Sequence, residues 1–129
     1  MKTSSIRLFR QALIWAPVVL AACGGGGDSG SPPVNLAPTF TSSAQVTVDE
    51  NTSGTLYTFA ATDPDGNSLS ISVVPGGDEA AFDIDIPSRT IRALTLLDFE
   101  APADANGDNV YEVTLEARDT GGLSARLNL

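Results

Sequence analysis

The residues of this sequence best suited to chemistry are carboxylates that recur in short groups. In an extended chain, residues i and i+2 point to the same side, so Asp63 with Asp65, and Asp98 with Glu100, can each offer two carboxylates to one point. Gathered carboxylates repel one another, and a hard cation relieves that repulsion. Calcium takes about 6–8 oxygen ligands in flexible geometry, so this spacing favours a calcium site. The alternative is that these acids only cap turns at strand ends. The groups are Asp49-Glu50-Asn51, Asp63-Pro64-Asp65, Asp98-Phe99-Glu100 and Arg118-Asp119-Thr120.

The single cysteine of the chain, Cys23, follows a segment typical of secretion signals. The first ten residues carry three cations and no acid, and an apolar run follows over residues 12–22. This run is shorter than the about 20 apolar residues of a membrane span. Residues 20–23, Leu-Ala-Ala-Cys, resemble the lipobox of bacterial lipoproteins. The resemblance implies that residues 1–22 are a lipoprotein signal peptide and that Cys23 carries the lipid anchor. An ordinary signal followed by an incidental cysteine is the alternative.

By the same resemblance, glycine rather than aspartate at position 24 implies an outer-membrane location in a bacterial cell envelope. Residues 23–34 comprise the lipidated cysteine and a tether of glycine, serine and proline, a composition typical of flexible linkers. We therefore expect the membrane to be one partner of the protein, reached through the lipid. The folded part is expected over residues 35–129.

The charge balance excludes several classes of function. Without residues 1–22, four arginines face all 16 acids, which gives a net charge of −12. Such a surface repels phosphate backbones, so we expect no nucleic-acid partner. The chain has no histidine, and its one cysteine is assigned to the lipid. Zinc sites, disulfides and catalysis by cysteine or histidine are therefore excluded.

From residue 35 onward the sequence predicts short strands separated by turns. In Tyr111–Arg118, apolar and polar residues alternate, the pattern of a strand with one buried face. Roughly seven such strands predict an all-β fold, a seven-stranded antiparallel Greek-key sandwich of immunoglobulin-like or cadherin-like type. Residues 104–108, Asp-Ala-Asn-Gly-Asp, imitate the start of an EF-hand loop, but the glycine is misplaced and no glutamate closes it, so we interpret them as a turn. The other predicted strands are 45–49, 55–62, 69–73, 82–85, 90–97 and 123–129.

Six short motifs follow one another over residues 37–119. They are Ala37-Pro38-Thr39-Phe40, Val48-Asp49-Glu50-Asn51, residues 61–66, Phe82-Asp83-Ile84, Leu97-Asp98-Phe99-Glu100 and residues 111–119. In this order they resemble the APxF, VxEN, AxDxDG, FxI, LDxE and YxVxVxAxD motifs of a cadherin repeat, of the bacterial cadherin-like kind. Together they span nearly the whole predicted domain.

The resemblance implies two groups of calcium ligands at opposite ends of the sandwich. Glu50, Asp98 and Glu100 would lie at its C-terminal end, and Asp63, Asp65 and Asp119 at its N-terminal end. In the family each full site forms between successive repeats and their linker. Here a tether precedes the domain, with Asn35 as the one substitute ligand, and the closing DxNDN motif is absent. We therefore expect two half-sites of weak affinity and a domain that lacks its C-terminal end.

These features predict a lipid-anchored, calcium-binding cadherin-like module for cell adhesion or protein–protein interaction, with other cadherin-like repeats or surface proteins as partners. The alternative is a passive stalk or spacer of a larger surface lipoprotein, one that binds or acts on polysaccharide. A sugar-binding domain usually exposes aromatic side chains, and here Tyr57, Phe59, Phe82 and Tyr111 fall at predicted core positions, which leaves Phe99. A domain this small offers little room for a substrate cleft, so we expect no enzymatic activity.

Overall fold

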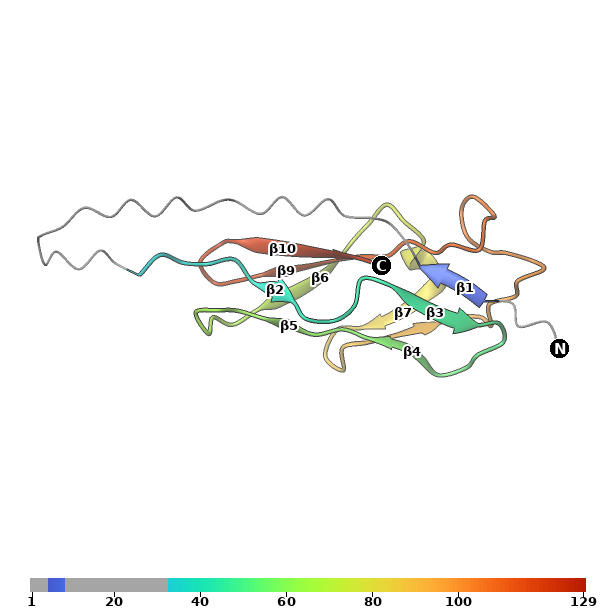
Figure 1. Cartoon of the computed structure of the whole chain (residues 1–129), viewed down its shortest axis with the longest axis horizontal. Coiled ribbons are helices and arrows are strands. Elements are labelled where there is room, and N and C mark those ends of the chain that lie inside the picture. The colour runs from blue at the N-terminus through green and yellow to red at the C-terminus, as the bar shows by residue number, and fades with distance from the viewer. Residues whose placement is uncertain (1–4, 9–32) are drawn as a thin grey trace, which may run out of the picture.

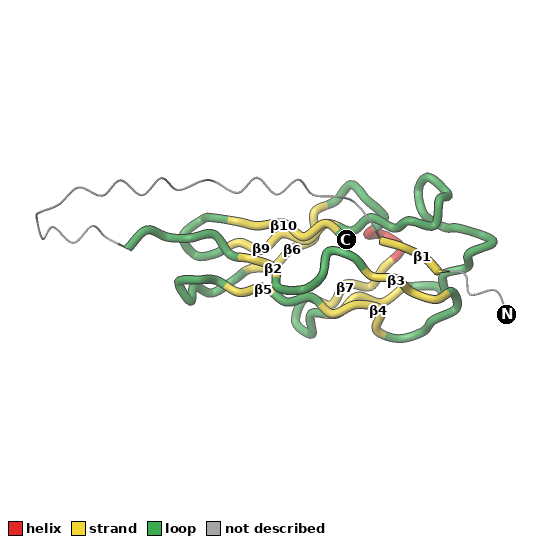
Figure 2. Tube along the Cα trace, in the orientation of Figure 1, coloured by secondary structure: helices red, strands yellow, loops and turns green. Residues whose placement is uncertain are grey.

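The computed structural model describes residues 5–8 and 33–129, and this part of the chain is all-β, with antiparallel strands (Figures 1 and 2). Its one helical element is a short 3-10 turn, and no helix of the described residues is long and apolar enough to cross a membrane. The predicted all-β class is confirmed. Cys23 and the signal segment lie outside the described residues, apart from Ser5–Leu8. The strands are β1 (Ser5–Leu8), β2 (Thr39–Phe40), β3 (Val46–Asp49), β4 (Thr55–Thr58), β5 (Ala61–Thr62), β6 (Ser70–Val74), β7 (Phe82–Asp85), β8 (Thr90–Ala93), β9 (Thr114–Arg118) and β10 (Ser124–Asn128), and the 3-10 turn is Glu79–Ala81.

Two three-stranded sheets enclose the core. One sheet has the order β6–β9–β10 and the other the order β4–β8–β7, while β2 pairs with β5 and β1 pairs with β3. Both sheets and the segments next to them contribute to one cluster of buried side chains, which is how two amphipathic sheets remove their apolar faces from water. Its members are Phe59, Phe82, Ile91, Leu97, Tyr111, Val113, Leu115, Leu127 and Leu129.

The alternation predicted for residues 111–118 is confirmed by burial. Tyr111, Val113, Leu115 and Ala117 are at most 1% exposed, and the residues between them are half-buried. Regular pairing of β9 with β10 begins at Thr114, but the two segments stay together before it, because Val113 and Leu129 exchange two backbone hydrogen bonds of 3.0 and 2.8 Å. A shift of one residue would turn the glutamates of this strand into the core, so the register is strongly specified.

The single strand predicted over residues 55–62 is wrong in one respect, because the chain changes partner inside it. β4 pairs with β8 and has an irregularity between Thr55 and Tyr57, whereas β5 pairs with β2. Phe59 lies between the two strands and is fully buried, and its backbone N–H donates to the Arg89 carbonyl at 3.0 Å. A strand that moves from one sheet to another in this way forms a corner of the fold.

The strand predicted over residues 90–97 ends early, at Ala93. Its neighbour β7 begins at Phe82, which is opposite Ala93, and the 3-10 turn precedes it, so the regular pairing ends with one further backbone hydrogen bond, from the Leu94 N–H to the Ala81 carbonyl at 3.0 Å. The side chains of Leu94 and Leu96 are exposed, at 62% and 56%. Leu97 is 3% exposed and returns the chain to the core just before Asp98 and Glu100.

Tyr111 joins this loop to the core. Its ring packs edge-on against Phe82, with centroids 5.5 Å apart, and its hydroxyl accepts a hydrogen bond from the Ala103 N–H at 3.1 Å. Asp78 also holds this loop. Its two carboxylate oxygens accept from the backbone N–H groups of Ala105 and Glu112, both at 2.8 Å.

We expect Tyr111→Phe to lower the free energy of unfolding by about 1 kcal/mol, because the Ala103 N–H loses its acceptor while the ring packing stays. Urea unfolding of the variant and of Tyr57→Phe measures this. The Tyr57 hydroxyl bonds the Ser43 carbonyl at a more exposed position, so its loss should cost less. Equal effects would contradict the role assigned to Tyr111.

Asp78→Ala should destabilise the fold by roughly 2–4 kcal/mol, because two backbone donors lose a charged acceptor. Asp78→Asn keeps one acceptor oxygen and should recover part of that loss. Hydrogen exchange locates the effect: the amides of Ala105 and Glu112 should lose protection in Asp78→Ala before the amides of β9 do. Uniform loss across the sheet would show that Asp78 has no local role.

Candidate calcium sites

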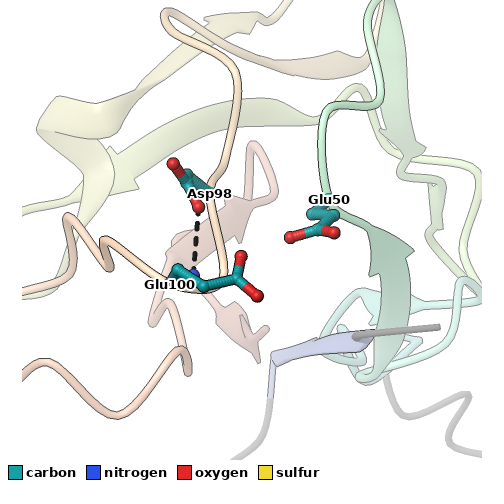
Figure 3. A group of neighbouring side chains, drawn as sticks. All are labelled: Glu50, Asp98 and Glu100. Atoms are coloured by element: carbon teal, nitrogen blue, oxygen red, sulfur yellow. Dashed lines mark hydrogen bonds between the residues drawn. The ribbon is translucent and has the colours of Figure 1, made fainter. Parts of the chain in front are cut away.

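Glu50, Asp98 and Glu100, here called the Glu50 cluster, come together at one end of the domain (Figures 1 and 3). Glu50 directly follows β3, while Asp98 and Glu100 belong to the loop after β8. One carboxylate oxygen from each residue lies within 4.8 Å of the others. The structure therefore brings Glu50 to two predicted ligands, Asp98 and Glu100, that lie 48 and 50 residues further along the chain.

Backbone hydrogen bonds hold the two segments of the Glu50 cluster against each other. The Asn51 N–H donates to the Leu97 carbonyl at 2.9 Å, and the Phe99 N–H donates to Glu50 Oε2 at 3.3 Å. Asn51 has a positive φ of 60°, which turns the chain sharply after Glu50. Within the loop, Asp98 Oδ1 accepts from the Glu100 N–H at 3.0 Å, and Figure 3 shows the Glu100 and Glu50 carboxylates in the gap between the two segments.

The Glu50 cluster has the dimensions and charge of a cation site. Two oxygens bound to one calcium ion at about 2.3–2.6 Å are at most about 5 Å apart, so oxygens within 4.8 Å can bind one ion with little movement. Glu50 is half-buried, and Asp98 and Glu100 are exposed, which leaves the site open to an incoming ion. The ion pairs found among the described residues, Arg92–Asp83 and Arg126–Glu116, involve none of the three.

Asn109 is a polar neighbour of this cluster that was not among the residues predicted from the sequence. Its Nδ2 donates to the Phe99 carbonyl at 3.0 Å, and its backbone has a positive φ of 62°. Its Oδ1 is buried and accepts no hydrogen bond from the described residues. Asparagine adopts the left-handed backbone conformation more readily than most residues do. The position of Asn109 directly after Gly107-Asp108 is therefore the sequence feature that could have indicated its positive φ.

The second predicted group, Asp63, Asp65 and Asp119, is called the Asp63 cluster and lies at the other end of the domain (Figure 1). Asp63 and Asp65 follow β5, and Asp119 follows β9. Unlike the Glu50 cluster, these carboxylates do not all approach within 4.8 Å of one another among the described residues. They are instead connected through the side chain of Asn35 and the backbone beside it.

Asn35 and the residue after it make hydrogen bonds to three side chains in and beside the Asp63 cluster. Its Nδ2 donates to Asp119 Oδ2 at 2.9 Å, its Oδ1 accepts from Asn67 Nδ2 at 2.7 Å, and the next residue, Leu36, donates its N–H to Asp65 Oδ2 at 2.6 Å. A Cβ at Gly121 would lie 2.3 Å from Asn35 Nδ2, so only glycine fits there. An open cavity of about 290 Å³ borders Asn35, Asp65 and Asn67.

Asp63 and Asp119 differ in how their oxygens are satisfied. Asp63 Oδ1 accepts from the N–H groups of Asp65 and Asn67, at 2.9 and 3.0 Å, but its Oδ2 is buried and has no partner among the described residues. Burial alone raises the pKa of Asp119, but hydrogen bonds from Asn35 and from three backbone N–H groups outweigh it and lower this pKa below its ordinary value. Both oxygens of Asp119 are thus occupied by hydrogen bonds, and Asp63 Oδ2 is the carboxylate oxygen of this pair that has no partner among the described residues.

The turn interpretation of residues 104–108 agrees with the hydrogen bonds. Asp104 is 8% exposed, and its two oxygens accept from the N–H groups of Asp108 and Asn109, at 2.9 and 3.2 Å. Asp108 Oδ1 in turn accepts from the Val110 N–H at 2.8 Å. These carboxylates serve the loop backbone, as acids in turns commonly do.

Comparisons with known proteins give a local likeness only. No protein-family model matches the chain, and no solved structure matches it significantly. Among curated proteins, Halomucin of Haloquadratum walsbyi is 38% identical over 72 residues, which is 53% of this chain. The chain spans about 1% of the length of Halomucin, so this likeness concerns a small part of that protein.

Proposed function

We propose that this protein is a lipid-anchored, calcium-binding cadherin-like module of the bacterial cell surface that serves adhesion or protein–protein interaction. The observation that carries the proposal is the Glu50 cluster, where three carboxylates from two segments share one space and take no part in the ion pairs found among the described residues. Such an arrangement is unfavourable when empty and is relieved by a divalent ion. Cys23 would hold the module at the outer membrane through its lipid.

The position of the two acidic clusters supports a role in line with neighbouring modules. The Asp63 cluster lies where β5 and β9 end, and the Glu50 cluster lies at the opposite end, where β3 ends (Figure 1). A cation at either end can be shared with a neighbouring domain, which stiffens the junction. We assign the seven-stranded Greek-key arrangement of the cadherin type to the domain on the same grounds. The partners would be other cadherin-like repeats or surface proteins.

The number and the exposure of the carboxylates favour a metal over acid–base catalysis. In glycosidases the two carboxyl groups are about 5–5.5 Å or 6.5–9.5 Å apart, so that a sugar fits between them. In the Glu50 cluster three carboxylates have oxygens within 4.8 Å of one another, and two of the three are exposed. We therefore propose a binding function and no enzymatic one.

Calorimetric titration of residues 23–129, with Cys23→Ser, tests calcium binding. We expect a dissociation constant of roughly 10⁻⁴–10⁻³ M, the range of extracellular calcium modules. Calcium at ten times that constant should stabilise the fold by about 1.4 kcal/mol. Absence of both heat and thermal stabilisation at millimolar calcium would refute the calcium site and leave the passive spacer as the function.

Glu100→Gln locates the ion, because the Glu100 carboxylate makes no hydrogen bond or ion pair within the described residues. With a chelator present, the variant should be as stable as the original chain or slightly more stable, because one repelling charge is gone. With calcium present, it should bind at least tenfold more weakly, and Asp63→Asn should leave this site intact. Asp83→Asn, which changes an exposed acid paired with Arg92, is the matched control and should bind normally. If both Glu100→Gln and Asp83→Asn bound calcium normally, the ion would lie elsewhere.

A further inference from the structure

Strand β3 has one strand partner in the described part of the chain, and that partner is β1. The two pair antiparallel over four residues, from Ser5 opposite Asp49 to Leu8 opposite Val46. Neither of the three-stranded sheets, nor the β2–β5 pair, includes β3 (Figure 1). The regular backbone pairing of β3 therefore depends entirely on Ser5–Leu8.

Ser5–Leu8 belongs to residues 1–22, whose sequence predicts a signal peptide that is removed. Cleavage before Cys23 would take β1 away and leave β3 without a strand beside it among residues 33–129. The core would stay complete, because its buried members all lie between Phe59 and Leu129. The processed domain is thus expected to fold with an open strand edge.

This edge has few of the features by which proteins block unwanted strand pairing. Natural edge strands are protected by lysine, proline or bulges, or by being very short. β3 has the sequence Val-Thr-Val-Asp, and its pairing with β1 has no register shift. Val46 packs against the buried cluster, and the Asn51 N–H just after the strand donates to the Leu97 carbonyl at 2.9 Å, while Thr47 and Asp49 are exposed. β3 therefore keeps contacts with the domain that do not involve β1, and it can accept another strand.

We propose that the β3 edge is a strand-acceptor site that an extended, cationic segment of another polypeptide fills in the processed protein, antiparallel to β3. Addition of a strand to a sheet edge is a common mode of peptide recognition, in which main-chain hydrogen bonds supply much of the affinity.

The charge expected of the partner segment follows from the acidic residues around β3. β3 ends in Asp49 and is followed by Glu50, and the processed chain has a net charge of −12. The strand that pairs there in the structure, Ser-Ile-Arg-Leu, carries a cation and no acid. Two copies of the acidic domain would repel each other, so a second copy is disfavoured as the occupant.

The proposal rests on removal of residues 1–22, which is part of the proposed function, but the strand site can be tested separately. The probe is a capped peptide with the sequence of residues 3–10, titrated into residues 23–129 with Cys23→Ser in the presence of a calcium chelator. We expect binding to this chain and little binding to residues 1–129, where the tethered β1 competes at high effective concentration. Failure of the calcium proposal would leave this result unchanged, and failure of processing would appear as uncleaved chain in the host membrane.

Peptides with blocked backbone donors show whether binding is by strand addition. Alternate residues of a strand hydrogen-bond to one neighbour. A peptide N-methylated at positions 5 and 7 and a peptide N-methylated at positions 6 and 8 should therefore bind with different affinities, because only one of them loses the N–H groups that face β3. That peptide should bind roughly tenfold or more weakly, and the other should be little affected. A peptide with Arg7→Glu and Arg10→Glu should bind at least several-fold more weakly at low salt. Alternate amides of β3 should gain hydrogen-exchange protection when the unmodified peptide binds.

Three results would overturn the proposal. The first is no binding of the unmodified peptide to residues 23–129. The second is equal weakening by both N-methylated peptides, which would indicate contact through side chains alone. The third is a dimer of residues 23–129 with protected β3 amides in the absence of peptide, which would make a second copy the occupant.

Discussion

The buried side chain of Tyr111 is the contact on which the candidate site most depends. Its ring is fully buried and packs edge-on against Phe82 of the opposite sheet, so it takes part in closing the two sheets on each other. Its hydroxyl holds the Ala103 N–H, in the loop that carries Asp98 and Glu100. The same residue thus links the apolar core to the placement of the carboxylates. An aromatic ring with a polar tip suits this position because one end is dry and the other satisfies a backbone donor.

The two acidic clusters illustrate two ways in which a fold can accommodate adjacent carboxylates. In the Asp63 cluster, amide and backbone N–H groups, chiefly from Asn35 and its neighbours, hold Asp65 and Asp119 and so fix the start of the domain against the β9–β10 turn. In the Glu50 cluster, hydrogen bonds use only part of each carboxylate, and the oxygens face one another. In the first arrangement hydrogen bonds satisfy the carboxylate oxygens of Asp119 and part of those of Asp63 and Asp65, whereas the second leaves more of its charge uncompensated and gains most from a cation. This difference makes the Glu50 cluster the stronger candidate, although the sequence treats the two groups alike.

The sequence predicts local features well and pairing between distant segments less well. The alternation of residues 111–117 identifies a buried face because its period depends on neighbouring residues only. The end of β8 at Ala93 depends on where β7 begins, and the division of residues 55–62 depends on two different partner strands. No residue pattern within either segment indicates where β8 ends or where residues 55–62 change partner. The i,i+2 spacing likewise places Asp98 beside Glu100, but the prediction that Glu50 lies next to them comes from the resemblance to cadherin repeats and not from spacing. Asn109 escapes prediction because its role comes from the loop that folds around it.

The Glu50 cluster and the β3 edge meet at one point of the chain, because Glu50 directly follows the last residue of β3. A cation held by Glu50, Asp98 and Glu100 would fix the end of β3 against the loop after β8. A strand with a fixed end loses less conformational freedom when another strand is added beside it. This ordering of β3 by calcium favours strand addition. Thermodynamic linkage requires that an added strand change calcium affinity by the same factor by which calcium changes the affinity for the strand. The opposing effect is electrostatic, because a bound cation reduces the attraction of the acidic edge for a basic strand. The sign of the coupling thus depends on whether ordering of β3 or the local charge dominates.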